Sequence, residues 1–288
     1  MYPAAFEYHR AASIADALAL MERYGDDAKV LAGGHSLLPV MKLRFATPGH
    51  LIDIGRIAGL SGISEAEGYV VIGAMTRHAD VASSAVVSRT VPALSDAASV
   101  IGDVQVRNCG TIGGSMVHAD PGADMPAVMV ALGAQIVATG KSGDRTIEAH
   151  AYFTGTFTTS LGAGELVTQV RIPLPAAGSG SAYEKHPDAA SGYAVVGVAA
   201  LVTVAGGKVS AASVAITGMS SMATRLRGVE TALIGQPANA KSAVTAGRAA
   251  ASELDLYDDA HGSAAYKANL AAVVAGRALA SALARAGA

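Results

Sequence analysis

The sequence predicts a two-domain α+β protein, and three observations support this. Its 288 residues exceed what one compact core usually organises, so two domains are expected. Hydrophobic residues make up 51% and charged residues 15% of the chain, which excludes a disordered protein. Residues 173–181 are rich in proline, glycine, alanine and serine. Beyond this candidate linker, strand patterns are followed by a run of helical patterns, as in α+β domains.

A helix and short strands are expected before residue 56. Ser13 can accept hydrogen bonds from the free N–H groups of a helix start, and Asp16 stands at the capping-box position. Gly25 ends the pattern, so the helix covers residues 14–24. The other elements expected here are a buried strand over residues 29–32, a helix over 37–43 and a strand over 50–54.

The next 120 residues predict hairpins around short helices. In order, the expected elements are a hairpin of residues 60–64 and 69–73, helical pieces over 76–98 broken by Pro92, a glycine-punctuated loop over 107–115, a buried helix over 126–132, a hairpin of 135–139 and 145–148, and a strand over 165–172. After the linker we expect a long hairpin of residues 193–205 and 208–217, then helices over 225–234, 238–252 and 264–285. The predicted domains are therefore residues 1–175, with subdomains of about 1–55 and 56–175, and residues 179–288.

Charge and cysteine content exclude several classes of function. The formal net charge is -2 and no basic stripe is present, so nucleic acid is not an expected partner. The longest apolar runs, such as residues 194–205, are too short to cross a bilayer, and no Sec-type signal is visible, so a cytoplasmic protein is expected. Cys109, expected to be a buried filler, is the single cysteine and cannot ligate an iron–sulfur cluster. Any electrons would pass through an organic cofactor.

Two glycine turns carry the strongest chemical signal. They are residues 32–36, Ala-Gly-Gly-His-Ser, and residues 111–115, Thr-Ile-Gly-Gly-Ser. Paired glycines let the backbone approach a ligand, and successive N–H groups form anion-binding nests. Two nests suit a pyrophosphate, to which Lys29 could add charge. A single Gly-Gly-x-Ser is more often a plain tight turn, and both the Rossmann and the P-loop spacings are missing.

At these turns the chain resembles a known family. The first turn continues into Leu-Leu-Pro and Met-Lys-Leu-Arg by residue 44, and the second is followed by Asp-Pro at 120–121 and Asp-Met-Pro at 124–126. This pattern is similar to the FAD-binding subunits of molybdenum hydroxylases, the xanthine dehydrogenase family, and within it to the medium subunits of aerobic carbon monoxide dehydrogenases. The resemblance covers essentially the whole chain. It implies a vanillyl-alcohol-oxidase-like (PCMH-type) FAD-binding domain of two subdomains, plus a C-terminal domain of antiparallel strands and helices.

Carried over position by position, the resemblance implies a set of FAD contacts and no catalytic or metal-binding residue. The contacts are Lys29, Ala32, Gly33, Gly34, His35, Ser36, Ile101, Thr111, Gly114, Ser115, Val117, Asp124, Leu166, Lys185 and Tyr193. Tyr193 matches the aromatic residue that covers one flavin face. Structural alternatives stay open: Ile101, Val117 and Leu166 as core residues, Asp124 as a helix cap, and Tyr193 as an ordinary strand residue. A metal site at His118 is declined, because no second histidine ligand is evident.

The resemblance also implies partners. A large molybdopterin-binding subunit and a small subunit with [2Fe-2S] clusters would pass electrons to this FAD in a dimer of heterotrimers, and quinone, NAD or oxygen would accept them. The complex would be cytoplasmic or peripheral on the inner face of the membrane. In the carbon monoxide enzymes the stretch after Tyr-Glu-Lys is basic, whereas here residues 186–193 read His-Pro-Asp-Ala-Ala-Ser-Gly-Tyr. Carbon monoxide, an aldehyde, a purine or another N-heterocycle therefore all stay open as substrates. The alternatives are a stand-alone flavin oxidase or reductase and a subunit that has lost its cofactor.

Overall fold

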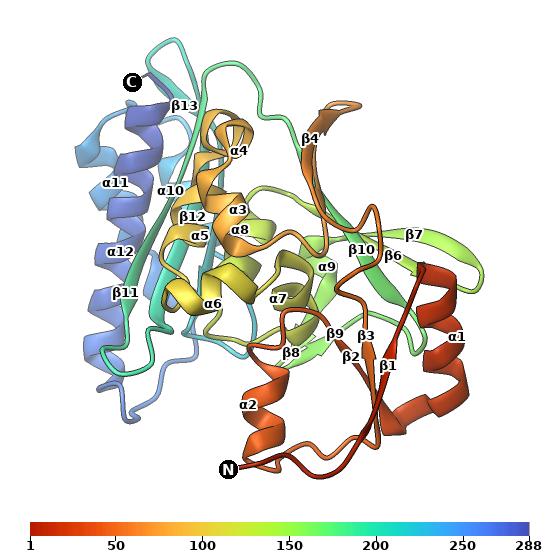
Figure 1. The fold of residues 1–288 in the computed structure, drawn as a ribbon. Coiled ribbons are helices and arrows are strands. Elements are labelled where there is room, and N and C mark those ends of the chain that lie inside the picture. The colour runs from red at the N-terminus through yellow and green to blue at the C-terminus, as the bar shows by residue number, and fades with distance from the viewer. Residues whose placement is uncertain (288) are drawn as a thin grey trace.

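The computed structural model describes residues 1–287, so Ala288, the end of the predicted second domain, lies outside the described residues. The chain begins with a small parallel sheet in the order β1-β3-β2, drawn in red and orange in Figure 1. Its elements are β1 (Glu7–Arg10), α1 (Ile14–Tyr24), η1 (Gly25–Asp27), β2 (Ala28–Leu31), α2 (Leu37–Lys42) and β3 (His50–Asp53).

The predicted start and end of α1 are confirmed. The Ser13 hydroxyl accepts a hydrogen bond from the Asp16 N–H at 3.1 Å, and Gly25 ends the helix with a φ of 52°. The expectation of a buried strand at residues 29–32 is wrong in part. The strand is present at β2, but Lys29 is exposed and none of its four residues is fully buried, because β2 forms the edge of its sheet.

The middle of the chain forms a five-stranded antiparallel sheet in the order β4-β5-β10-β6-β7, covered by a group of short helices (Figure 1). The strands are β4 (Ile63–Ala66), β5 (Tyr69–Gly73), β6 (Gln135–Gly140), β7 (Gly143–Glu148), β10 (Leu166–Pro173) and the separate pair β8 (Phe153–Gly155) and β9 (Thr158–Thr159). The helices are α3 (His78–Ser83), α4 (Ala85–Thr90), α5 (Pro92–Ser99), α6 (Val104–Cys109), α7 (Ile112–His118), α8 (Asp124–Ala131) and α9 (Ala149–Tyr152).

The predicted loop over residues 107–115 is wrong. Asp103 caps α6 and Thr111 caps α7, each through a side chain that accepts a backbone N–H, so only Gly110 and Thr111 separate the two helices. Both glycines of the second turn therefore lie inside the first turn of α7. Cys109, expected to be buried, is exposed at the end of α6.

The C-terminal part packs a four-stranded antiparallel sheet, in the order β11-β12-β13-β14, against helices drawn in blue at the left of Figure 1. Its elements are β11 (Ser179–Pro187), β12 (Ala194–Ala205), β13 (Lys208–Thr217), β14 (Thr224–Arg225), α10 (Arg227–Leu233), α11 (Ala240–Gly247), η2 (Ala250–Glu253) and α12 (Ala264–Arg285). The predicted hairpin and the last helix are confirmed. The predicted linker is shorter than expected, because β10 ends at Pro173 and β11 already begins at Ser179.

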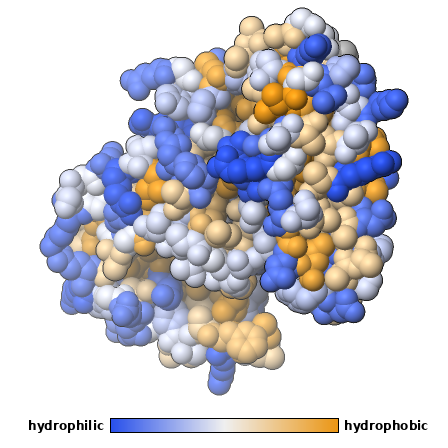
Figure 2. All heavy atoms as spheres, turned by 180° about the vertical axis from the view of Figure 1, so that it is seen from behind, coloured by the Kyte–Doolittle hydropathy of each residue, from blue (hydrophilic) through white to orange (hydrophobic). Residues whose placement is uncertain are grey.

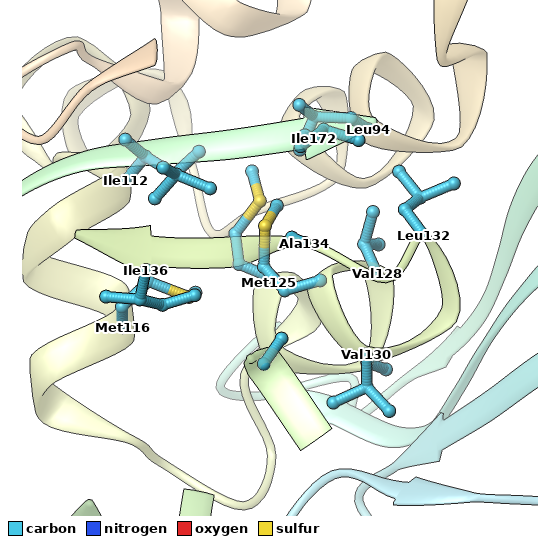
Figure 3. Packing of buried hydrophobic residues seen from close by; sticks show 14 of the residues in the cluster. Leu94, Ile112, Met116, Met125, Val128, Val130, Leu132, Ala134, Ile136 and Ile172 are labelled. Atoms are coloured by element: carbon cyan, nitrogen blue, oxygen red, sulfur yellow. The ribbon is translucent and has the colours of Figure 1, made fainter. Parts of the chain in front are cut away.

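Three hydrophobic clusters hold these parts together. One joins α1 to the small sheet, one fills the space between the five-stranded sheet and its helices, and one lies between the C-terminal sheet and α10–α12. Figure 3 shows Ile112 and Met116 of α7 pointing into the central cluster beside Ile136. This packing fixes α7, and Gly114, between those anchors, lies near Ala32 just after the end of β2, where an added Cβ would be 3.9 Å from the Ala32 Cβ.

The outside of the molecule is mixed in character. Figure 2 shows hydrophobic atoms in several separate patches among hydrophilic side chains on the face seen from behind. Among residues 1–287, every helix is too short or too polar to span a membrane.

Candidate functional site

A cavity of about 1330 Å³ lies between the small N-terminal sheet, α7 and the loop that precedes β12. It exceeds the roughly 300–1,000 Å³ of pockets for drug-sized ligands, so a dinucleotide is a suitable occupant by size. Fourteen of the fifteen residues predicted to contact the cofactor line it: Lys29, Ala32, Gly33, Gly34, His35, Ser36, Ile101, Thr111, Gly114, Ser115, Val117, Asp124, Leu166 and Tyr193. Lys185 lies behind this wall. That these residues touch a cofactor stays a prediction.

The first glycine turn presents free donors to the cavity. Gly34 has a φ of 73°, which favours glycine, and Gly33 packs against the backbone of Cys109 and Gly110, just before the second turn. A Cβ at Gly33 would lie 2.8 Å from Gly110 Cα and closer still to the Cys109 carbonyl oxygen. Within residues 1–287, the N–H groups from Gly33 to Ser36 donate no hydrogen bond to another protein group. They are therefore available to an anion, and the binding of an anion there stays a prediction.

The second turn works differently from the predicted nest. The Gly113 N–H is bonded to the Ala74 carbonyl oxygen at 2.8 Å, and the Gly114 N–H to Thr111 Oγ1 at 3.1 Å. The Ser115 N–H is bonded to the Thr111 carbonyl oxygen at 3.0 Å. These amides are therefore engaged inside the protein. What the turn can offer a ligand is the hydroxyl groups of Thr111 and Ser115 and the open space beside Gly114.

A buried ionic network stands behind the cavity wall. Asp124 accepts a hydrogen bond from the Lys185 ammonium at 2.8 Å and another from the Tyr183 hydroxyl at 2.6 Å. The Asp124 and Lys185 side chains are each 5% exposed. Burial raises the pKa of the Asp124 carboxyl, and the Lys185 ammonium opposes that shift. Asp124 makes no side-chain cap at α8, so its interpretation as a simple helix cap is wrong.

The network also positions a neighbouring loop. Lys185 Nζ donates a second hydrogen bond, to the Val100 carbonyl oxygen at 3.1 Å. Val100 precedes Ile101, a partly buried residue of the cavity wall. Lys185 thus acts on the cavity through Asp124 and Val100, which explains why it does not line the cavity itself.

Tyr193 is held in the cavity wall by a structured loop. The Asp188 carboxylate accepts hydrogen bonds from the Ser191 N–H and hydroxyl, both at 2.8 Å, and the Asp188 N–H bonds to the Tyr193 carbonyl oxygen. The Tyr193 ring lies near Gly122 and is nearly half exposed. Burial of the remainder raises the pKa of the Tyr193 hydroxyl. The arrangement leaves an aromatic face available to a planar ligand.

Two of the residues with open structural alternatives differ in burial. Leu166 is buried at the start of β10 and packs with the small sheet, which agrees with a core role. Val117 is exposed in the cavity wall, so a core role for it is wrong.

His78 is a buried titratable residue of the cavity wall that is absent from the predicted contacts. It is the first residue of α3, is buried, and has no hydrogen-bond partner for Nδ1 among the described residues. Burial lowers its pKa to about 4, so the ring is neutral near pH 7. The ring lies beneath Gly110, where an added Cβ would be 2.9 Å from its Cδ2 atom. A lone histidine at a helix start offers no pattern that would single it out.

His118, for which the sequence shows no second histidine ligand, lies in the cavity wall. His118 Nε2 lies 3.8 Å from Asp120 Oδ2, and the ring is tilted against Phe157. The histidine thus has a carboxylate and an aromatic neighbour at the cavity rim.

Comparison with known proteins defines the class of protein. Residues 4–175 match the family described as the FAD binding domain in molybdopterin dehydrogenase, and residues 181–282 match the CO dehydrogenase flavoprotein C-terminal domain. The chain belongs to this FAD-binding family of the molybdopterin dehydrogenases. The resemblance seen in the sequence and the predicted fold class are thereby confirmed.

Individual relatives match over nearly the whole chain. The chain is 44% identical over 285 residues to the carbon monoxide dehydrogenase medium chain of Hydrogenophaga pseudoflava, covering 99% of each. It is 39% identical over 287 residues to the 6-hydroxypseudooxynicotine dehydrogenase complex subunit alpha of Paenarthrobacter nicotinovorans, covering 99% of this chain and 97% of that one. A solved carbon monoxide dehydrogenase from Hydrogenophaga pseudoflava, lacking the Mo-pyranopterin moiety of its cofactor, superposes with a TM-score of 0.94 at 45% identity, covering 99% of both chains.

Proposed function

We propose that the chain is the FAD-binding electron-transfer subunit of a molybdenum hydroxylase complex. The observation that carries the proposal is that both glycine turns line the same large cavity, in a chain that belongs to an FAD-binding family. Free N–H groups between Gly33 and Ser36 can bind one phosphate, and the hydroxyls of Thr111 and Ser115 can donate to its neighbour. A pyrophosphate joined to a flavin and an adenosine suits this cavity in size and in the hydrogen-bond donors that the two turns present.

The residues of the chain bind and position the FAD, and none is required as an acid or base on an organic substrate. When bound, FAD supplies electron transfer in steps of one or two electrons. The turn at Gly33–Ser36 fixes the phosphates, while Tyr193 offers its ring face to the planar end. The Asp124–Lys185 pair holds Val100 and Ile101 against the cavity, which keeps that wall rigid. Buried neighbours such as His78 keep water away from the same wall.

The proposal includes two partner chains, a large molybdopterin-binding subunit and a small one with [2Fe-2S] clusters, in a dimer of heterotrimers. It is supported by relatives named as a medium chain and as the subunit of a dehydrogenase complex. Electrons would enter from the iron–sulfur subunit and leave to quinone, NAD or oxygen. An exposed free thiol at Cys109 agrees with a reducing compartment, the cytoplasm or the inner face of its membrane.

The substrate of the complex is proposed to be set by the molybdenum subunit. Carbon monoxide is one candidate, in view of the relative named for it, and an N-heterocycle or an aldehyde are the others. The two relatives compared above are named for different substrates at 44% and 39% identity, which supports a flavin subunit common to several chemistries.

We further propose that residues 1–175 bind FAD, through subdomains of about 1–55 and 56–175, and that residues 179–288 close over it. The matched ranges 4–175 and 181–282 and the separate C-terminal hydrophobic cluster support this division.

A Tyr193→Ala variant tests the placement of the flavin. Pyrophosphate binding should survive, so the flavin content should stay near normal, while the visible spectrum of the flavin or its reoxidation rate changes. Tyr2→Ala, at an exposed tyrosine outside the cavity wall, is the control. An unchanged spectrum and an unchanged reoxidation rate in Tyr193→Ala would remove this residue from the flavin site.

A further inference from the structure

A second cluster of polar side chains lies on the small N-terminal sheet, outside the wall of the large cavity. Glu7 and His9 are on β1 and His50 is on β3, and these parallel strands pair with Glu7 opposite His50. Residues two apart on a strand share a face, and so do residues paired across strands. The three side chains therefore project from one face of the sheet, and their ligand atoms all lie within 4.8 Å of one another.

Only one of the three distances between these atoms is a hydrogen-bond length. His9 Nε2 lies 3.0 Å from His50 Nδ1, whereas Glu7 Oε2 is 3.8 Å from the first nitrogen and 3.6 Å from the second. Both carboxylate distances exceed hydrogen-bond length. Donors bound to one tetrahedral Zn²⁺ at about 2.0–2.2 Å stand about 3.3 Å apart, which lies between the observed values.

The surroundings hold the two imidazoles in place. Tyr24, at the end of α1, stacks on His50 with ring centroids 3.8 Å apart and on His9 at 4.8 Å. Asp27 Oδ2 lies 3.9 Å from His50 Nε2, the nitrogen that faces away from His9. This distance exceeds hydrogen-bond length, so Asp27 acts on His50 as a nearby negative charge, in the place where carboxylates support metal-binding histidines.

The cluster is also open to an ion. The histidine side chains are 20% and 18% exposed and the Glu7 side chain is 71% exposed, so the site is half-sheltered with one flexible ligand at its mouth. We propose that Glu7, His9 and His50 bind a divalent transition-metal ion of the Zn²⁺ class, with water in the fourth position. Two imidazoles and a carboxylate are ligands of this class. The ion would tie the N-terminal strand to β3.

The test uses the full-length chain, dialysed against Zn²⁺ and analysed for bound metal, with Co²⁺ as a spectroscopic substitute. The wild type should retain one more Zn²⁺ per chain than His50→Ala or His9→Ala, and its Co²⁺ form should show the strong visible absorption of a four-coordinate ion. His150→Ala, at an exposed histidine outside the cluster, should behave as the wild type. Asp27→Asn should weaken binding by about 10- to 100-fold.

A plain hydrogen bond between the two histidines is the outcome that overturns the proposal. In that case the wild type and both histidine variants retain equal Zn²⁺, and added Zn²⁺ leaves the melting temperature unchanged. If a histidine variant fails to fold, Glu7→Gln decides, because Glu7 is largely exposed and its loss leaves the histidine pair in place. Weakened Zn²⁺ binding in Glu7→Gln supports the site, and undiminished binding of the extra ion overturns the three-residue assignment.

Discussion

The Asp124–Lys185 pair is the most tightly constrained interaction between single residues near the cavity, because both partners are charged and almost fully buried. The cost of burying the two charges is offset only while each has the other as partner. The pair joins the predicted FAD-binding region to the C-terminal region, since Asp124 begins α8 and Lys185 lies on β11. Loss of this ion pair should therefore destabilise both regions.

Replacing one partner should destabilise the protein strongly. Lys185→Met leaves the Asp124 carboxylate unpaired in the interior, and we expect a loss of about 3–5 kcal/mol in the free energy of unfolding. The double variant Asp124→Asn/Lys185→Met should recover much of that loss, because no buried charge is then left alone. Urea denaturation measures both, with Lys208→Met, at an exposed lysine of β13, as the control. Equal losses in the single and double variants would contradict the account.

His78 should make stability depend on pH. Its folded pKa of about 4 lies below its unfolded value of 6.5, so the unfolded chain binds a proton first as the pH falls. Stability from this residue is full above pH 6.5 and is lost as the pH falls to about 4, with a total of roughly 3 kcal/mol. Denaturation of wild type and His78→Gln at several pH values measures this. As the pH falls from 6.5 to about 4, the wild type should lose free energy of unfolding relative to His78→Gln. Parallel curves of stability against pH would show that His78 is not buried in its neutral form.

At the scale of elements, the packing of the two glycine turns against each other shapes the cavity. Gly33 touches the backbone between α6 and α7, and Gly113 lies equally close to Ala74, where an added Cβ would be 2.6 Å from its Cβ. The need for glycine at residue 33 therefore comes from backbone packing, and the effect on a ligand follows from it.

Gly33→Ala should push the two turns apart. A methyl group there meets backbone atoms that cannot rotate away, so we expect a loss of about 1–3 kcal/mol in stability. The flavin content of the purified protein should fall with it. Gly155→Ala is the matched control, because its Cβ would meet only Thr158 Cβ, at 4.0 Å. Normal flavin content and stability in Gly33→Ala would contradict this packing.

Sequence patterns predicted the elements that rest on local signals. The last helix was predicted to its end residues, and the structure shows that the Ser263 side chain caps its start. Helix α7 was missed because glycine disfavours helices, and it forms only since Ile112 and Met116 anchor it in the core. β11 was not among the predicted strands, because its residues alternate weakly. In the site, the lining residues came from motif resemblance, while His78 and the role of Lys185 depend on tertiary contacts that no motif records.

At the scale of the whole molecule, the chain is proposed to be one of several subunits that pass electrons from one to the next. The fold provides a large cavity with anion-binding donors, and the proposed catalytic metal lies on another chain. Isolation from partners should therefore leave FAD binding intact while removing substrate oxidation. This separation distinguishes an electron-transfer subunit from a stand-alone flavin oxidase.

The most direct measurement is the absorption spectrum of the protein purified from its native source, with mass analysis of the chains that accompany it. We expect flavin bands together with iron–sulfur absorbance, and two further chains, one large and one small. A yellow single chain that oxidises a substrate alone would contradict the subunit role, and a colourless preparation would contradict FAD binding itself.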